Sequence, residues 1–207
     1  MSFYNHVVHF SLKSRFILTL ICITFYSMLF GQRVVINTSK GKIEVELYGD
    51  KAPITTTNFL QYVQDKVYDG GTFYRAVRKD NQRQGQPYIE VIQGGIDQDS
   101  MKRRDPITLE RTGTTGIKHE NGTISMARST PNSATSEFFI CINDQPSLDF
   151  GGNRNPDMQG FAAFGKVTKG MNVVKKIQKG KTTFYPSLGL NQKLVKPVTI
   201  HSITIIN

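Results

Sequence analysis

Two stretches of the chain alternate apolar with polar residues. Residues 34–48 contain the runs VVINT and KIEVELY, and residues 39–41 between them supply a turn. Alternation around a short turn predicts a β-hairpin with one face directed inward. Residues 197–206 alternate in the same way near the C-terminus, which predicts a further strand.

Two other stretches place apolar residues at helical spacing. Residues 53–67 carry one apolar stripe, and Pro53 suits the first turn of a helix. We therefore predict a helix over this range. Val173, Val174 and Ile177 indicate a second, short helix that ends near Gly180.

The rest of the chain consists of short apolar runs and polar connections. Residues 72–77, 89–93 and 161–167 are predicted to be strands. Residues 94–120 form a long connection with little periodicity, which is typical of a functional or mobile loop. Residues 181–197 are predicted to be an irregular surface segment.

The central stretch, residues 122–144, is the most informative. It holds two apolar runs, residues 124–127 and 138–142, around a polar loop of Ser, Thr, Pro, Asn and Glu. The second run suits a strand because it has two aromatic and two β-branched residues. A loop of small residues can bring its backbone N–H and C=O groups close to a ligand. Such a surface can take up an extended peptide.

This central stretch resembles the cyclophilins, the peptidyl-prolyl cis–trans isomerases. The resemblance continues in the family's order through GTFYRAV (71–77), IEVIQGG (89–95), SLD (147–149) and GFAAFGKV (160–167). These motifs cover most of the chain after about Val34. The resemblance implies one mainly β domain over residues 32–207. It would be a closed eight-stranded antiparallel β-barrel capped by two α-helices, with residues 197–206 closing the barrel.

The resemblance also implies which residues act on a substrate. Arg75 takes the position of the family's catalytic arginine, and Gln93 that of the glutamine that binds the substrate and supports the arginine. The substrate-binding residues implied are Val91, Phe139, Leu148 and Phe161 around the prolyl ring, and Ala127, Arg128, Ser129 and Glu137 along the flanking chain. No metal and no cofactor is implied.

The expected chemistry needs no covalent step. Rotation about an X–Pro bond faces a barrier of about 18–20 kcal/mol because the C–N bond is partly double. A groove that fits the twisted amide better than either planar form lowers that barrier. A fixed donor aimed at the prolyl nitrogen favours the twisted state. Arg75 is the natural donor, and the expected partners are proline-containing unfolded or exported polypeptides, bound by a monomer.

A second hypothesis is an exported module that binds prolyl peptides, or acts as a chaperone, with weak turnover. It is motivated by departures from the family pattern. Glu90 falls where many members have an aromatic pocket wall, Ser147 stands where some have tryptophan, and Glu137 replaces a frequent glutamine. These departures concern the depth of the pocket more than the arginine.

The N-terminal segment predicts export. Lys13 and Arg15 precede the apolar run 16–30, a pattern typical of a secretory signal. We therefore assign residues 1–31 as a signal peptide or, alternatively, an uncleaved membrane anchor. In a bacterium, the domain would then be periplasmic, or anchored to the membrane and facing the periplasm.

Charge and cysteine content limit which partners and which kinds of chemistry are expected. The formal charge is +10, and it is +8 without Lys13 and Arg15, which leaves 24 basic against 16 acidic residues. The positive residues are scattered and no run interleaves them with aromatics, so nucleic acid is not an expected partner. Of the two cysteines, Cys22 lies in the N-terminal segment and Cys141 is expected to be a small buried hydrophobe.

Overall fold

The computed structural model describes residues 31–96 and 103–206 of the chain. The segment predicted to be a signal or anchor lies outside the described residues apart from Gly31, as does Cys22. Within the described ranges, no helix combines the length and the apolar character needed to span a membrane.

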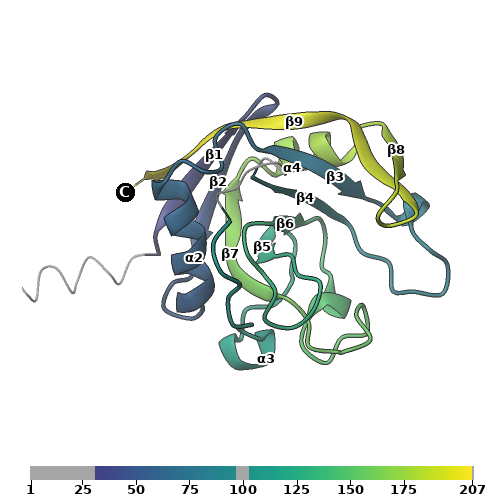
Figure 1. Ribbon diagram of the computed structural model, residues 1–207, viewed down its shortest axis with the longest axis horizontal. Helices are drawn as coiled ribbons and strands as arrows, with labels where there is room; N and C mark the ends of the chain where they lie inside the picture. The colour runs from purple at the N-terminus through teal and green to yellow at the C-terminus, as the bar shows by residue number, and fades with distance from the viewer. Residues whose placement is uncertain (1–30, 97–102, 207) are drawn as a thin grey trace, which may run out of the picture. The chain divides into compact units, whose positions relative to one another are not determined.

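Within these ranges, nine antiparallel strands form one sheet, and eight of them close into a barrel (Figure 1). The order around the barrel is β1, β2, β7, β5, β6, β4, β3 and β9, and β9 pairs back with β1. β8 is an addition that pairs with β9. The strands are β1 Arg33–Thr38, β2 Gly41–Leu47, β3 Thr72–Val77, β4 Val91–Gly95, β5 Thr123–Met126, β6 Phe138–Cys141, β7 Ala162–Lys169, β8 Thr182–Tyr185 and β9 Leu190–Ile206. The predicted mainly β, closed eight-stranded barrel is confirmed.

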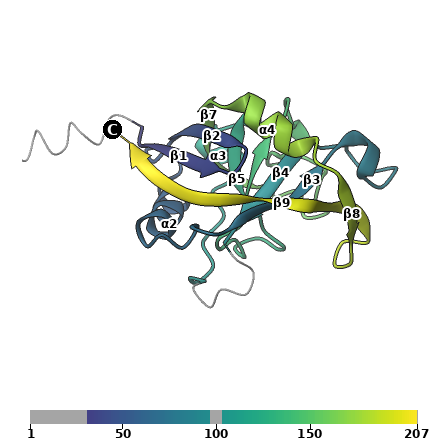
Figure 2. The same cartoon turned by 90° about the horizontal axis from the view of Figure 1, so that it is seen from above.

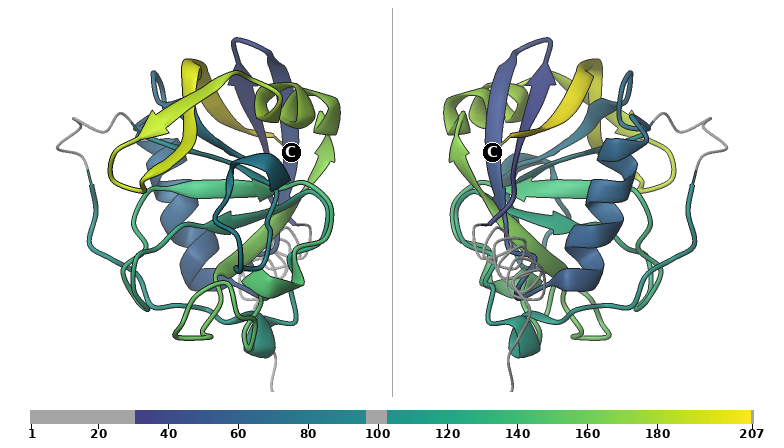
Figure 3. Two further views of the ribbon diagram at one scale, coloured as in Figure 1. Left: turned by 90° about the vertical axis from the view of Figure 1, so that its right-hand side faces the viewer. Right: turned by 90° about the vertical axis from the view of Figure 1, so that its left-hand side faces the viewer.

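Two helices cover the barrel, α2 (Pro53–Gln64) and α4 (Met171–Gln178). They lie on opposite sides of the strands (Figures 2 and 3). The backbone N–H groups of Ile54 and Thr55 donate to the Glu110 carboxylate at 3.1 and 2.7 Å. A carboxylate is favoured at a helix N-terminus, so this contact ties the long connection before β5 to α2. Shorter helical turns are α3 (Thr112–Thr115) and the 3₁₀ turns Lys79–Asn81 and Pro146–Leu148.

Most elements agree with the sequence pattern, with ends shifted by up to three residues; the exception is β9, which begins seven residues before the predicted strand. One prediction is wrong. Residues 181–197 are not irregular, because they form β8, a turn and the first half of β9. Gln192 and Leu194 are buried while residues 191, 193 and 195 are exposed, so the segment does alternate. One inward position is a glutamine, which conceals the alternation from a reading based on apolar residues.

Buried apolar residues form two separate clusters. The larger one fills the barrel and includes Phe59, Phe73 and Phe138. The smaller one lies on the other face of β4 and β6 and consists of Val77, Ile89, Val91, Phe139, Cys141 and Leu148. Because successive side chains of a strand point to opposite faces, β6 supplies Phe138 and Ile140 to the barrel and Phe139 and Cys141 to the smaller cluster. Burial also raises the pKa of the Cys141 thiol, which agrees with its predicted role as a buried hydrophobe.

Candidate active site

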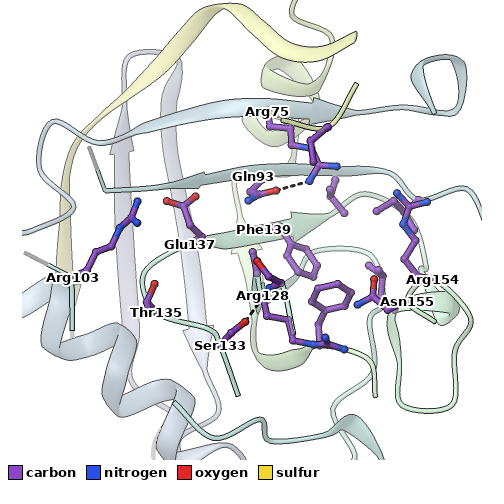
Figure 4. A pocket seen from close by; sticks show the side chains of 17 residues that line it. Arg75, Gln93, Arg103, Arg128, Ser133, Thr135, Glu137, Phe139, Arg154 and Asn155 are labelled. Atoms are coloured by element: carbon purple, nitrogen blue, oxygen red, sulfur yellow. Dashed lines mark hydrogen bonds between the residues drawn. The ribbon is translucent and has the colours of Figure 1, made fainter. Parts of the chain in front are cut away.

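One cavity of about 550 Å³ opens over the smaller cluster. All ten residues predicted to bind or act on a substrate line it: Arg75, Val91, Gln93, Ala127, Arg128, Ser129, Glu137, Phe139, Leu148 and Phe161. In Figure 4, Arg75 reaches over the cavity toward Gln93, with Phe139 below it. Arg103 and Thr135 lie at one end of the cavity, and Arg154 and Asn155 lie at the other.

The floor of the cavity is apolar and closely packed. Val91, Phe139 and Leu148 are all buried. The ring of Phe161 meets that of Phe139 edge to face, with centroids 5.4 Å apart and planes at 88°. Edge-to-face contact is a favourable aromatic arrangement, so it holds both rings at fixed angles. The result is an apolar slot beneath the arginine.

The departures at Glu90 and Ser147 do not alter this slot. Glu90 does not line the cavity; its carboxylate accepts a hydrogen bond from Asn143 Nδ2 at 3.0 Å. Ile89 lines the cavity and is buried. Ser147 is also absent from the cavity lining. The pocket wall at this point is therefore an isoleucine.

Arg75 is held in place by two glutamines. Its Nη1 donates to Gln93 Oε1 at 2.7 Å, while Nε and Nη2 donate to Gln192 Oε1 at 2.9 and 2.6 Å. Three of the five guanidinium N–H groups are thereby used. Among the described residues no other acceptor is bonded to Arg75, so one N–H on each Nη remains available to a ligand.

Burial lowers the pKa of Arg75 to about 10. The positive charge of Arg154 acts in the same direction, and Tyr74 and Tyr185 oppose it. A pKa near that value still leaves the guanidinium protonated at neutral pH. The arginine is therefore a charged donor in a partly dry site, where a hydrogen bond that it donates gains strength.

A chain of hydrogen bonds continues from Arg75 along the cavity wall. Gln93 accepts from Arg75 and donates from Nε2 to the Tyr74 hydroxyl at 2.8 Å. The Tyr74 hydroxyl donates in turn to Glu137 Oε2 at 2.6 Å. Burial raises the pKa of Tyr74, with the Glu137 charge acting in the same direction, so its hydroxyl stays a donor. The orientation of the Gln93 amide is thus fixed from both ends.

The Arg128 side chain is committed to its own contacts. Its two Nη atoms donate to Asp157 Oδ2 and Oδ1, both at 2.8 Å, and Nε donates to the Gly160 carbonyl at 2.8 Å. Hydrogen bonds from Arg128 lower the pKa of Asp157 to about 2. Since the side chain is paired, a role for Arg128 in binding a peptide falls to its backbone, as the resemblance implies.

A buried histidine supports the floor from behind. The ring of His119 stacks on Phe139, with centroids 5.9 Å apart and planes at 15°. Its Nδ1 lies 2.8 Å from Asp149 Oδ1, and its Nε2 lies 3.0 Å from Ser125 Oγ. Because the Asp149 carboxylate can only accept, the neutral ring carries its proton on Nδ1. Nε2 is then an acceptor for the Ser125 hydroxyl. Ser125 is fully buried, so this Ser–His–Asp arrangement offers no nucleophile to a substrate.

This histidine should make stability depend on pH. Burial lowers the pKa of His119 below 6.5, against the opposing effect of Asp149. On acidification through pH 6.5, His119 binds a proton in the unfolded chain but stays neutral in the folded chain. The free energy of unfolding should therefore fall, by at most about 1.4 kcal/mol per pH unit for one proton. We expect His119→Gln to flatten this slope in urea titrations between pH 7.5 and 5.5.

The exposed His201 provides the matched control. His201→Gln should keep the slope of the unaltered protein, because the effect comes from burial of the His119 ring. Equal slopes in the unaltered protein and His119→Gln would contradict the assignment.

Several site residues were not identified from the sequence. Tyr74 lies next to Arg75 in the FYR motif, which marked only the arginine. His119 has no metal-ligand spacing around it in the sequence, and nothing in its sequence context signals stacking on Phe139. Gln192 lies 117 positions from Arg75 in a segment predicted to be irregular. The pairing register of β3 with β9 brings Gln192 close to Arg75, and this register cannot be predicted from the local sequence.

Comparisons with known proteins agree with the geometry. Residues 33–205 match the model of the family described as cyclophilin type peptidyl-prolyl cis-trans isomerase/CLD. A peptidyl-prolyl cis-trans isomerase from Acinetobacter baylyi is 37% identical over 174 residues, which covers 83% of this chain and 84% of the relative. Peptidyl-prolyl cis-trans isomerase A from Dickeya dadantii is 35% identical over 196 residues, with coverage of 92% and 95%.

The fold also matches solved structures. The crystal structure of a cyclophilin type isomerase from Cryptosporidium parvum superposes with a TM-score of 0.67 at 21% identity. The alignment covers 86% of this chain and 99% of that one. From the family match and the relatives above 30% identity, the chain belongs to the cyclophilin type peptidyl-prolyl cis–trans isomerases.

Proposed function

We propose that the protein accelerates rotation about X–Pro peptide bonds by a non-covalent mechanism in which Arg75 donates a hydrogen bond to the prolyl nitrogen. The observation that supports this most directly is the position of Arg75. Its guanidinium, with two N–H groups left for a ligand, borders the same cavity as the apolar slot of Val91, Phe139 and Leu148.

Each part of the cavity has a role in this mechanism. The prolyl ring binds in the apolar slot, which removes its surface from water. As the C–N bond twists, amide resonance is lost and the nitrogen becomes pyramidal with a localised lone pair. A donor aimed at that lone pair stabilises the twisted form more than either planar form, which is the condition for catalysis. Nothing is oxidised, hydrolysed or transferred.

The flanking peptide would bind along the central loop. Ala127, Arg128 and Ser129 follow β5 at the cavity edge and supply backbone groups. Gln93 lies beside Arg75 with its amide oriented by Tyr74. We assign Gln93 to a double role: contact with the peptide carbonyl region and support of the arginine. Holding the chain on both sides of the proline leaves rotation about one bond as the remaining freedom.

We also propose a role in assisting the folding of exported polypeptides. The support for this is the basic and apolar pattern of residues 1–31. In a bacterium the domain would then act in the periplasm, released or attached to the membrane by that segment. The protein would act there as a monomer on proline-containing chains.

A protease-coupled assay tests the catalytic proposal. A short Ala-Pro-Phe peptide carrying a chromogenic leaving group is cleaved only in its trans form, so the slow phase reports isomerisation. We expect the purified domain to accelerate this phase in proportion to its concentration. A slow phase unchanged from the uncatalysed rate would refute catalysis.

NMR exchange spectroscopy on the same peptide distinguishes catalysis from the alternative, a module that binds prolyl peptides with weak turnover. Catalysis predicts exchange cross-peaks between cis and trans resonances that appear on adding a small amount of protein. A pure binder predicts shifts around Phe139 without such cross-peaks. The structure removes part of the case for the alternative, because Glu90 does not line the cavity.

A further inference from the structure

The hairpin of β8 and the first half of β9 contributes three residues to the candidate site. Leu188, in its turn, lines the cavity. The ring of Tyr185 meets that of Tyr74 edge to face, with centroids 6.2 Å apart. Gln192 accepts two hydrogen bonds from Arg75. Figure 1 shows this hairpin at the end of β3 that lies away from α2, next to the β3–β4 connection.

The orientation of the Gln192 amide is determined by its partners. Arginine has only donors, so the atom that faces Arg75 must be the oxygen. At its other end, Nε2 donates to the carbonyl of Asn81 at 2.8 Å. The side chain is fully buried. A buried amide with both ends satisfied has one favourable orientation, and the opposite orientation would leave both groups unpaired.

The partner of Gln192 is itself fixed. The Asn81 side chain donates to the carbonyls of Ala76 and Asn191 at 3.0 and 3.1 Å, and accepts from the Arg78 N–H at 2.8 Å. These bonds join the 3₁₀ turn after β3 to β9. Gln192 is thus held by a rigid connection between two neighbouring strands and not by a mobile loop end.

The two glutamines constrain Arg75 in different ways. Gln93 binds a single N–H on Nη1, and a single bond lets the guanidinium plane swing. Gln192 binds the adjacent Nε and Nη2 through one oxygen, which fixes the edge of the plane. With that edge fixed, the two free N–H groups have a defined direction. Donors aimed in advance at the site of developing charge stabilise a transition state more than donors that must reorient.

We propose that Gln192 is a positioning residue for isomerisation, setting the plane of the Arg75 guanidinium, so that the β8–β9 hairpin is part of the catalytic apparatus. The inference rests on the proposed function of Arg75. Gln192 does not line the cavity, so it acts through the arginine and not by touching the peptide.

The test is Gln192→Met, which keeps the side-chain length and removes the acceptor. Exchange-NMR line shapes on a prolyl peptide separate kcat from KM. We expect kcat to fall about tenfold, which corresponds to about 1.4 kcal/mol of transition-state stabilisation lost when the donor is no longer fixed, with KM changed less than about twofold. In an Arg75→Ala background, Gln192→Met should cause no further loss, because its effect passes through Arg75.

A direct readout is the NMR signal of the Arg75 Nε–H. It should move upfield in Gln192→Met, where the acceptor is lost. Gln192→Glu keeps an oxygen at this position, so its signal should stay near that of the unaltered protein and its kcat should exceed that of Gln192→Met. Gln192→Glu also serves if Gln192→Met does not fold.

Gln178→Met is the matched control. Gln178 is another buried glutamine, and its amide donates to the Val77 carbonyl at 3.1 Å, away from the cavity lining. We expect kcat to be unchanged in this variant. An active unaltered protein with equal kcat in Gln192→Met would overturn the positioning role alone. An additional loss in the Arg75→Ala background would also overturn it. An inactive unaltered protein would overturn the proposed function first.

Discussion

Replacing Arg75 by alanine should lower kcat/KM for a prolyl peptide about 100-fold, the usual size of losing one preorganised donor. Neither of the two glutamines that hold Arg75 can replace it as the donor. Gln93 and Gln192 both present their oxygens to the arginine, so without it they become acceptors with no donor to offer the prolyl nitrogen. Arg75→Lys should also be strongly impaired, because an ammonium cannot reproduce a planar fork held on two sides.

The Arg75→Ala substitution should also lower the stability of the fold. It leaves the buried oxygen of Gln192 without its partners, which costs roughly 1–3 kcal/mol. Thermal unfolding followed by circular dichroism is therefore needed beside the assay, so that lost activity is measured on folded protein. Arg111→Ala is the matched control, since Arg111 bonds Gln159 at 2.5 Å and does not line the cavity. Arg75→Ala with the rate of the unaltered protein would remove Arg75 from the mechanism.

Phe138→Ala should have the largest effect on stability, lowering the free energy of unfolding by about 3–5 kcal/mol. Phe138 is fully buried in the barrel. Its ring meets those of Phe59, Tyr68 and Phe73 edge to face, at centroid distances of 5.6, 5.5 and 5.6 Å. Truncation would leave a cavity between three rings that cannot collapse together. Since domains are stable by about 5–15 kcal/mol, much of the stability would be lost.

Urea titration of Phe138→Ala and Phe184→Ala gives the comparison. Phe184 lies on β8 and is 56% exposed, so its truncation should change stability by at most about 0.5 kcal/mol. A loss below about 1.5 kcal/mol in Phe138→Ala would mean that the barrel interior repacks around the missing ring. The three-ring contact would then not be a main support of the fold.

The first hairpin and α2 could be predicted from the sequence because alternation and helical spacing are local properties, whereas the closed barrel was implied by the resemblance. Burial alternates along β1 and β2, as the hairpin prediction requires, and Pro53 marks the start of α2. The ten predicted site residues came from resemblance, and the structure brings all of them to one cavity. The roles proposed for them rest on Arg75 and the buried Phe139 bordering the same cavity.

What escaped prediction depends on contacts between distant segments. Gln192 looks like a surface residue until β9 is paired with β3. Tyr74 has no evident role in the sequence, and it gains one only because Glu137, 63 positions later, accepts a hydrogen bond from its hydroxyl. Glu90 was placed on the pocket wall from its place in a motif, but its carboxylate is held by Asn143 outside the cavity. In each case the role of a polar side chain depends on a hydrogen-bond partner that cannot be identified from spacing in the sequence.

The alternation within β6 has a practical consequence for engineering. Positions 138 and 140 face the barrel interior, whereas 139 and 141 face the cluster under the cavity. Libraries that vary residue 139 together with Val91 and Leu148 therefore leave the barrel packing unchanged in composition. Residues that border the cavity can thus be varied on one face of the four-residue strand β6 while the other face keeps its packing inside the barrel.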